Sequence, residues 1–296
     1  MESIPLIDPP IQSLTLADGR IATWQEFGAP DGWPALYFHG GGSLSLEVGI
    51  FHREAVQRNI RLIATNRPGV AGSSLSARRT AAAYSDDLRE LLAHLRIDQF
   101  ACFGESNGGL MTMAVAATMS ARVVGAVPIN PTVPWFDPVA RSVTSGAAAW
   151  GYRLMRHWPR LLVRAAANSG QRIQKQKAAM TRRDGAFHPL DLAGPPPGTE
   201  PDIAEIHWRF MGSHHKQALL AELAFATRPW GFDHYAIPVP LDFYCGVYDS
   251  QAPFALVLTE RNADARFHHF AYGHHGFSHP DARRRILDTI AAYFQS

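Results

Sequence analysis

Cysteine is scarce in this chain, and long uncharged apolar runs are missing from it. The 296 residues include only two cysteines, Cys102 and Cys245, which cannot form a disulfide framework. No apolar stretch is long enough to predict a transmembrane helix. The first ten residues carry Glu2 and Asp8 and lack the basic-then-apolar pattern of a secretory signal, so we expect a cytoplasmic protein. A hydrophobic fraction of 46% excludes disorder and predicts one large domain, or a core with one inserted domain.

Acidic residues are missing from one long segment, residues 141–183. This segment holds ten Lys and Arg, which leaves 18 of the 28 basic residues against all 26 acidic ones elsewhere. Nucleic-acid binders are usually basic over a whole domain, so we predict no nucleic-acid partner. Two interpretations of the segment stay open: a solvated helical face, or a surface for an anionic partner such as a membrane, an acidic carrier or a substrate carboxylate. Its arginines at helical spacing are Arg153, Arg156, Arg160 and Arg164, beside Leu154, Trp158, Leu161 and Leu162.

Motifs for metals and nucleotide cofactors are also missing. The 14 histidines include three adjacent pairs, but adjacent residues do not share a helix face, and no H-E-x-x-H or C-x-x-C spacing occurs. No G-x-G-x-x-G follows an apolar run. We therefore predict neither a metal nor a cofactor.

What is present is an alternation of short apolar runs and amphipathic segments. This pattern predicts an α/β fold, because parallel strands need crossover connections. The alternation stops at Asn130-Pro131 and returns at about residue 237. We predict a core from 1–131 and 237–296, with 132–236 as a helical insertion. The expected strands are 11–16, 20–27, 35–38, 60–65, 100–103, 123–129, 239–245 and 266–270, and the expected core helices are 47–58, 80–95, 106–119, 253–258 and 280–294.

The run Gly104-Glu105-Ser106-Asn107-Gly108-Gly109 lies between a predicted strand and a predicted helix. In that context G-x-S-x-G holds the serine on a sharp turn, with its hydroxyl above the sheet at the positive end of the helix. A serine hydroxyl is a weak nucleophile and needs a base, which in turn needs an orienting group. Asp249 and His274 each come just after a predicted strand, where sites in parallel sheets form. The alternatives are His275, His268, His269 and His279 for the base, and Asp137 and Asp242 for the acid.

These segments together resemble the α/β-hydrolase superfamily. The resemblance rests on His39-Gly40-Gly41-Gly42, on Arg67-Pro68-Gly69 followed by Gly72-Ser73, on the turn at Ser106, and on Asp249 and Gly273-His274. It implies an eight-stranded, mostly parallel sheet with helices on both faces and a helical cap inserted after the sixth strand. It also implies Ser106 as nucleophile, His274 as base, Asp249 as orienting acid, and the N–H groups of Gly41 and Asn107 as the oxyanion hole. Glu105 and His39 are expected to be structural. Asn66 departs from the family, in which many members carry Asp, and puts a local turn or ion pair in question.

The predicted activity is hydrolysis of an ester, thioester or lactone. A cap rich in Trp, Phe and Met favours a small to medium hydrophobic acyl or lactone substrate. Two alternatives stay open: hydrolysis of a carbon–carbon bond in a diketone-like substrate by the same triad, and a receptor with weak turnover.

Overall fold

The computed structural model describes residues 7–77, 80–164, 216–246, 249–270 and 279–295. Its centre is an eight-stranded sheet with the order β1-β2-β4-β3-β5-β6-β7-β8. β1 pairs antiparallel with β2, and β2 pairs antiparallel with β4, whereas every other pair is parallel. The predicted eight-stranded, mostly parallel sheet is confirmed. The strands are β1 (Gln12–Thr15), β2 (Ile21–Gly28), β3 (Trp33–Phe38), β4 (Ile60–Asn66), β5 (Phe100–Glu105), β6 (Val123–Ile129), β7 (Leu241–Gly246) and β8 (Ala265–Phe270).

Helices cover both faces of this sheet. The described helices are the 3-10 helix η1 (Ser45–Phe51) with α1 (His52–Gln57), α2 (Ala81–His94), α3 (Asn107–Thr118), α4 (Pro138–Val143), α5 (Gly146–His157), α8 (Lys216–Phe225), α9 (Ala252–Arg261) and α10 (Pro280–Ala292). The segment expected as one helix over 47–58 is therefore split, because its first half forms 3-10 turns. The other core helices lie where they were expected.

Alternation along the strands separates two hydrophobic cores. In β3, Leu36 and Phe38 join α2, α3 and α9 in one core, while Ala35 and Tyr37 join η1, α1 and α10 in the other. Successive side chains of a strand point to opposite faces, so a continuously apolar strand feeds both cores. In helix α2, one face is buried against the first of these cores and includes Leu88 and Leu91. Thr80 caps the N-terminus of α2 by accepting a hydrogen bond from the N–H of Ala83.

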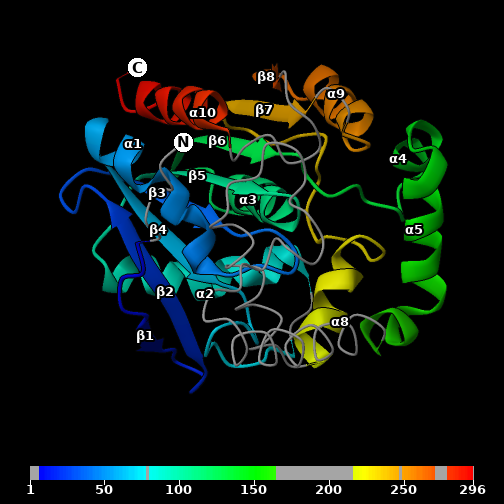
Figure 1. Cartoon of the computed structure of the whole chain (residues 1–296), viewed down its shortest axis with the longest axis horizontal. Coiled ribbons are helices and arrows are strands. Elements are labelled where there is room, and N and C mark those ends of the chain that lie inside the picture. Colours follow the sequence, from blue (N-terminus) through cyan, green and yellow to red (C-terminus); the bar gives the residue numbers. More distant parts are fainter. Residues whose placement is uncertain (1–6, 78–79, 165–215, 247–248, 271–278, 296) are drawn as a thin grey trace, which may run out of the picture.

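Between β6 and β7 the chain leaves the sheet. In the described part of this segment, the regular elements are the helices α4, α5 and α8, and residues 159–164 are also helical. We call residues 132–236 the β6–β7 insertion. Figure 1 shows its helices on the side toward which β6 and β7 point, which is the carboxyl edge of the parallel strands. This edge is where the sequence places the candidate site.

Candidate active site

Ser106 occupies a strained turn between β5 and α3. Its φ is +55° and its ψ is −114°, a conformation that L residues rarely adopt. Glycine makes the turn possible: a Cβ at Gly108 would lie 1.8 Å from the carbonyl oxygen of Phe38, and one at Gly104 would lie 2.4 Å from the same atom. Ser106 is partly exposed, whereas Glu105 and Asn107 on either side are buried. The turn thus opens a serine to a space beside the sheet edge.

That space is a cavity of about 580 Å³ with a mostly apolar lining. The core contributes polar residues that include Ser106, and the β6–β7 insertion contributes most of the apolar part together with Tyr152 and Glu222. Such a volume and lining are typical of sites for small organic ligands. The lining residues are Gly41, Gly42, Ser106, Asn107, Thr132 and Gln251 from the core side and its borders, and Ala148, Gly151, Tyr152, Met155, Leu162, Val163, Leu219, Glu222, Leu223 and Ala226 from the insertion.

Gly41 and Asn107, the two predicted oxyanion residues, meet at this cavity. A Cβ on Gly41 would lie 2.9 Å from Nδ2 of Asn107, so the two residues are neighbours. Asn107 is the first residue of α3, and the N–H groups of a first helical turn have no acceptor within the helix. The positive end of the α3 dipole adds to their attraction for an anion. The structure therefore brings Ser106, Gly41 and Asn107 to one place.

The side chain of Asn107 is fixed from two directions. Its Oδ1 accepts a hydrogen bond of 2.7 Å from the hydroxyl of Thr132, and its Nδ2 donates one of 2.9 Å to Oε2 of Glu222. Glu222 belongs to α8 in the insertion. The carboxylate of Glu222 thus joins the insertion to the residue that follows the serine.

Glu222 also forms a buried ion pair with Arg67. Nε and Nη2 of Arg67 donate to the two carboxylate oxygens of Glu222 at 2.6 and 2.8 Å, and the side chains are 2% and 8% exposed. The same guanidinium donates to the carbonyl oxygens of His39 and Gly40, the residues before Gly41. Arg67 therefore holds both the loop of the predicted oxyanion hole and α8. The sequence prediction missed Glu222, although a single acid in the apolar run 218–225 was a usable signal.

Asp249 lies beyond the carboxyl end of β7 and is buried. Its Oδ1 accepts a hydrogen bond of 2.8 Å from the N–H of Gln251, which lines the cavity. Burial, reinforced by the negative charge of Asp249, raises the pKa of Tyr152 to about 12, and Tyr152 also lines the cavity. The loop of Asp249 therefore borders the same cavity as Ser106.

The rival acids have other partners. Asp242 is the second residue of β7, toward the opposite edge of the sheet, and accepts hydrogen bonds from Arg266, His268 and Tyr293. These hydrogen bonds outweigh the effect of burial and lower the pKa of Asp242. Asp137 caps α4 by accepting from the N–H groups of Val139 and Ala140.

The histidines that the structure describes near the chain end also have structural places. His268 pairs with Asp242 at 2.6 Å, and His279 caps the N-terminus of α10. His269 lies on β8, where its ring contacts that of Phe267. The predicted base His274 and its neighbour His275 lie outside the described residues.

Three buried polar residues near the site form hydrogen bonds or close contacts inside the core. Nδ1 of His39 lies 2.9 Å from the carbonyl oxygen of Gly40, and Glu105 is 4% exposed beneath Gly40. At Asn66, the amide accepts from the N–H of Ser45 and donates to Thr23. Asparagine at this position therefore supplies both a donor and an acceptor, where a carboxylate would only accept.

Comparisons with known proteins place this geometry in a family. A model of the alpha/beta hydrolase fold matches residues 34–246, so the chain belongs to the α/β-hydrolase family. Similar solved structures include a putative aryl esterase from Burkholderia cenocepacia, with 18% identity, a TM-score of 0.70, and 97% of this chain and 100% of that chain covered. An esterase from Rhodococcus has 20% identity and a TM-score of 0.68 over 97% and 98% of the two chains.

The enol-lactonase from Burkholderia xenovorans has 15% identity and a TM-score of 0.63 over 96% of this chain and 100% of that one. At these identities the solved structures support the fold alone. No curated protein matches the sequence. Among the helices that the structure describes, none has the length and apolar character needed to cross a bilayer.

Proposed function

We propose that the protein is a serine hydrolase that cleaves an ester, thioester or lactone through an acyl-enzyme. One observation carries this proposal: Ser106 sits on a left-handed strand-to-helix turn and opens into an apolar cavity that Gly41 and Asn107 also line. A strained serine, a helix N-terminus and a second glycine-rich loop together provide a nucleophile and a place for an oxyanion.

In the proposed mechanism, Ser106 attacks the substrate carbonyl and His274 takes its proton. Asp249 orients the imidazole and stabilises its positive charge. The N–H groups of Gly41 and Asn107 stabilise the oxyanion, each contributing about 10²–10³-fold in rate. His274 then protonates the leaving group, and water releases the acyl group from Ser106 by the same steps. The other partners found for Asp242 and Asp137 support Asp249 as the acid.

The β6–β7 insertion would act as a cap, with α5 and α8 forming an apolar roof over the serine. Tyr152, Met155 and Leu223 contribute apolar surface to this roof. Such a surface favours a hydrophobic acyl or ring group over a charged polymer. The names of two structural neighbours, an aryl esterase and an enol-lactonase, are consistent with these substrate classes.

A fluorophosphonate probe tests the nucleophile directly. We expect one labelled serine in the full-length protein, loss of labelling in Ser106→Ala, and normal labelling in the control Ser250→Ala. A panel of aryl esters, acyl thioesters, lactones and diketones then tests the reaction. Turnover of diketones without esters would favour carbon–carbon hydrolysis, and tight ligand binding without labelling would favour a receptor.

A further inference from the structure

The outer side of α5, together with Trp158 at its end and the helical segment 159–164 that follows, presents large apolar side chains to solvent. Trp150, Trp158 and Leu161 are 65%, 58% and 64% exposed, and Leu154 is exposed as well. Ten large hydrophobic residues are exposed in the part of the chain that the structure describes, and these four fall within twelve consecutive positions. Single exposed apolar residues are normal, but a contiguous group marks an interaction surface.

The opposite side of α5 faces the cavity. Ala148, Gly151, Tyr152 and Met155 line it, and their spacing of three and four puts them on one helical face. Trp150 and Leu154 lie on the other face, four residues apart. The exposed tryptophans therefore do not serve the cavity, and the substrate pocket does not explain them.

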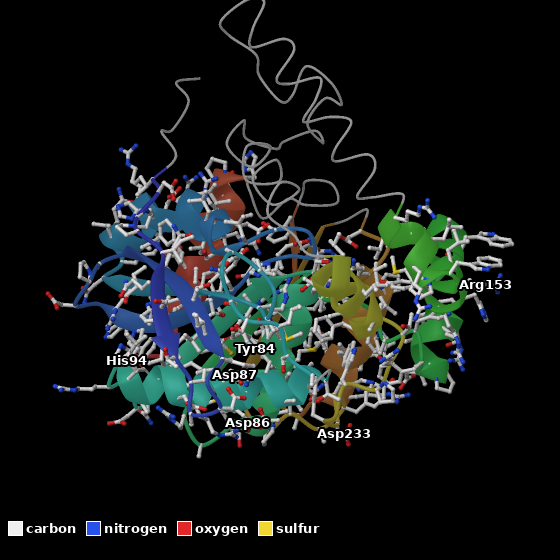
Figure 2. All side chains as sticks on the ribbon, turned by 90° about the horizontal axis from the view of Figure 1, so that it is seen from below. Tyr84, Asp86, Asp87, His94, Arg153 and Asp233 are labelled. Carbon is white, nitrogen blue, oxygen red and sulfur yellow. The ribbon has the colours of Figure 1, made fainter. Side chains whose placement is uncertain are left out.

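Cationic side chains accompany these apolar ones. We define the α5 surface as Trp150, Leu154, Trp158 and Leu161 together with Arg153, Arg156, Arg160 and Arg164, all of them exposed. The guanidinium of Arg153 lies 5.4 Å from the ring centre of Trp150, and Arg153 extends away from the body of the molecule (Figure 2). None of the four arginines forms an ion pair with a residue that the structure describes, and residues 141–164 contain no Asp or Glu.

We propose that the α5 surface docks the protein onto a bilayer that contains anionic phospholipid. Tryptophan and leucine on a helix favour the boundary between headgroups and acyl chains, and arginines beside them are attracted to anionic headgroups. A substrate carboxylate does not fit, because none of the four arginines lines the cavity. A nucleic acid offers phosphate but no apolar layer for the exposed leucines.

Docking would bring the cavity close to the membrane. One wall of the cavity is the inner face of α5, and a helix with its side chains is only about 10–12 Å across. If the proposed hydrolysis is correct, apolar esters held in the membrane would then reach the site over a short path. This consequence rests on the proposed function, whereas the docking itself does not.

Sedimentation of the full-length protein with vesicles tests the docking. We expect binding to vesicles of phosphatidylcholine with 30% phosphatidylglycerol, weak binding to pure phosphatidylcholine, and loss of binding as salt rises, because surface charges are screened. An arginine near an anionic surface contributes about fivefold in affinity. The triple variant Arg153→Glu, Arg156→Glu, Arg160→Glu should therefore bind at least 100-fold more weakly.

Two further variants locate the contact. The control Arg53→Glu, Arg96→Glu, Arg228→Glu makes the same charge change at exposed positions elsewhere and should keep binding within about threefold. Trp150→Ser with Trp158→Ser should weaken binding and remove quenching by brominated lipid, with an unchanged thermal transition as evidence of folding. Equal losses in both arginine triples, no vesicle binding by the wild type, or binding to polyglutamate without binding to vesicles would overturn the proposal.

Discussion

The two walls of the cavity are held in different ways. The core wall, with Ser106 and Asn107, depends on one tight turn whose glycines fit against the backbone of β3. The insertion wall depends on contacts between residues far apart in sequence. Arg67 and Glu222 are 155 positions apart, and the ring of Tyr152 on α5 stacks on that of Trp135 at 5.4 Å.

This difference separates the chemistry from the choice of substrate. The core wall carries every group with a proposed chemical role that the structure describes, and the turn that holds its serine is local. The insertion wall supplies apolar surface, and one buried ion pair couples it to the core wall. Changes in the core wall should therefore abolish turnover or folding, while changes in the insertion wall should alter stability and specificity.

The largest effect is expected at the histidine. We predict that His274→Ala lowers ester turnover by about 10⁴-fold or more, because the nucleophile and base act as a unit. His275→Ala is the matched control and should stay close to wild type. Steady-state kinetics with one aryl ester would measure both variants. A greater loss of turnover in His275→Ala than in His274→Ala would show that His275, and not His274, is the base.

Most of the fold could be predicted from the sequence because its signals are local. Buried parallel strands are continuously apolar, and α2 shows its buried face at intervals of three and four. The segment 47–58 differs because hydrophobic spacing alone does not distinguish a 3-10 turn from an α-helix. The buried Ser45 and Glu47 instead hydrogen-bond the segment to Gln25 and Tyr37 across the core.

The candidate site could be predicted only in part, because only some of its residues belong to a local sequence pattern. Ser106 and Asn107 belong to one short motif, and the structure places Gly41 beside them as expected. Glu222 was missed, since no local pattern connects an acid on α8 with Arg67 after β4. A partner for Arg67 follows from the tertiary fold, in which Glu222 of α8 reaches the guanidinium of Arg67.

Breaking the coupling between the walls should have the next largest effect. We predict that Glu222→Ala lowers the free energy of unfolding by about 3–5 kcal/mol, because it leaves the buried guanidinium of Arg67 without its anion. It should also lower kcat, since Arg67 positions the carbonyl groups of His39 and Gly40. Urea unfolding and kinetics would measure the two effects.

Two controls sharpen this prediction. Glu222→Gln keeps the size and one acceptor, so it should lose less stability than Glu222→Ala. Arg89→Ala breaks the exposed pair with Asp86 and should cost at most about 1 kcal/mol. A cost for Glu222→Ala as small as that for Arg89→Ala would show that α8 is not held by this ion pair.

Glycine substitutions compare the packing of the two walls. Gly108→Ala would place a Cβ 1.8 Å from the carbonyl oxygen of Phe38, so we expect a loss of about 1–3 kcal/mol or more. Gly151→Ala on α5 meets nothing within 4 Å and should stabilise the protein by about 0.5–1 kcal/mol. Thermal unfolding would report both, and equal destabilisation would contradict the contrast between the walls.

The smallest effect concerns His234, at the return of the insertion to the core. Burial lowers the pKa of His234, although the carboxylate of Asp137, with Oδ2 at 3.3 Å from Nε2, opposes this shift. The ring also packs against Trp230. A histidine with a lowered pKa in the folded state binds its proton more readily when unfolded. Its contribution to stability is therefore present above pH 6.5 and is lost as the pH falls through its lowered pKa.

His234→Phe keeps an aromatic ring and removes this titration. We predict that wild-type protein loses more stability than His234→Phe between pH 7 and pH 5, by a difference on the order of 1 kcal/mol, since one pKa unit corresponds to about 1.4 kcal/mol. Urea unfolding at the two pH values would measure it. His94→Phe, at an exposed histidine on α2, is the matched control and should follow the wild type. If His94→Phe and His234→Phe change the pH dependence equally, burial of His234 at the return of the insertion to the core is not its cause.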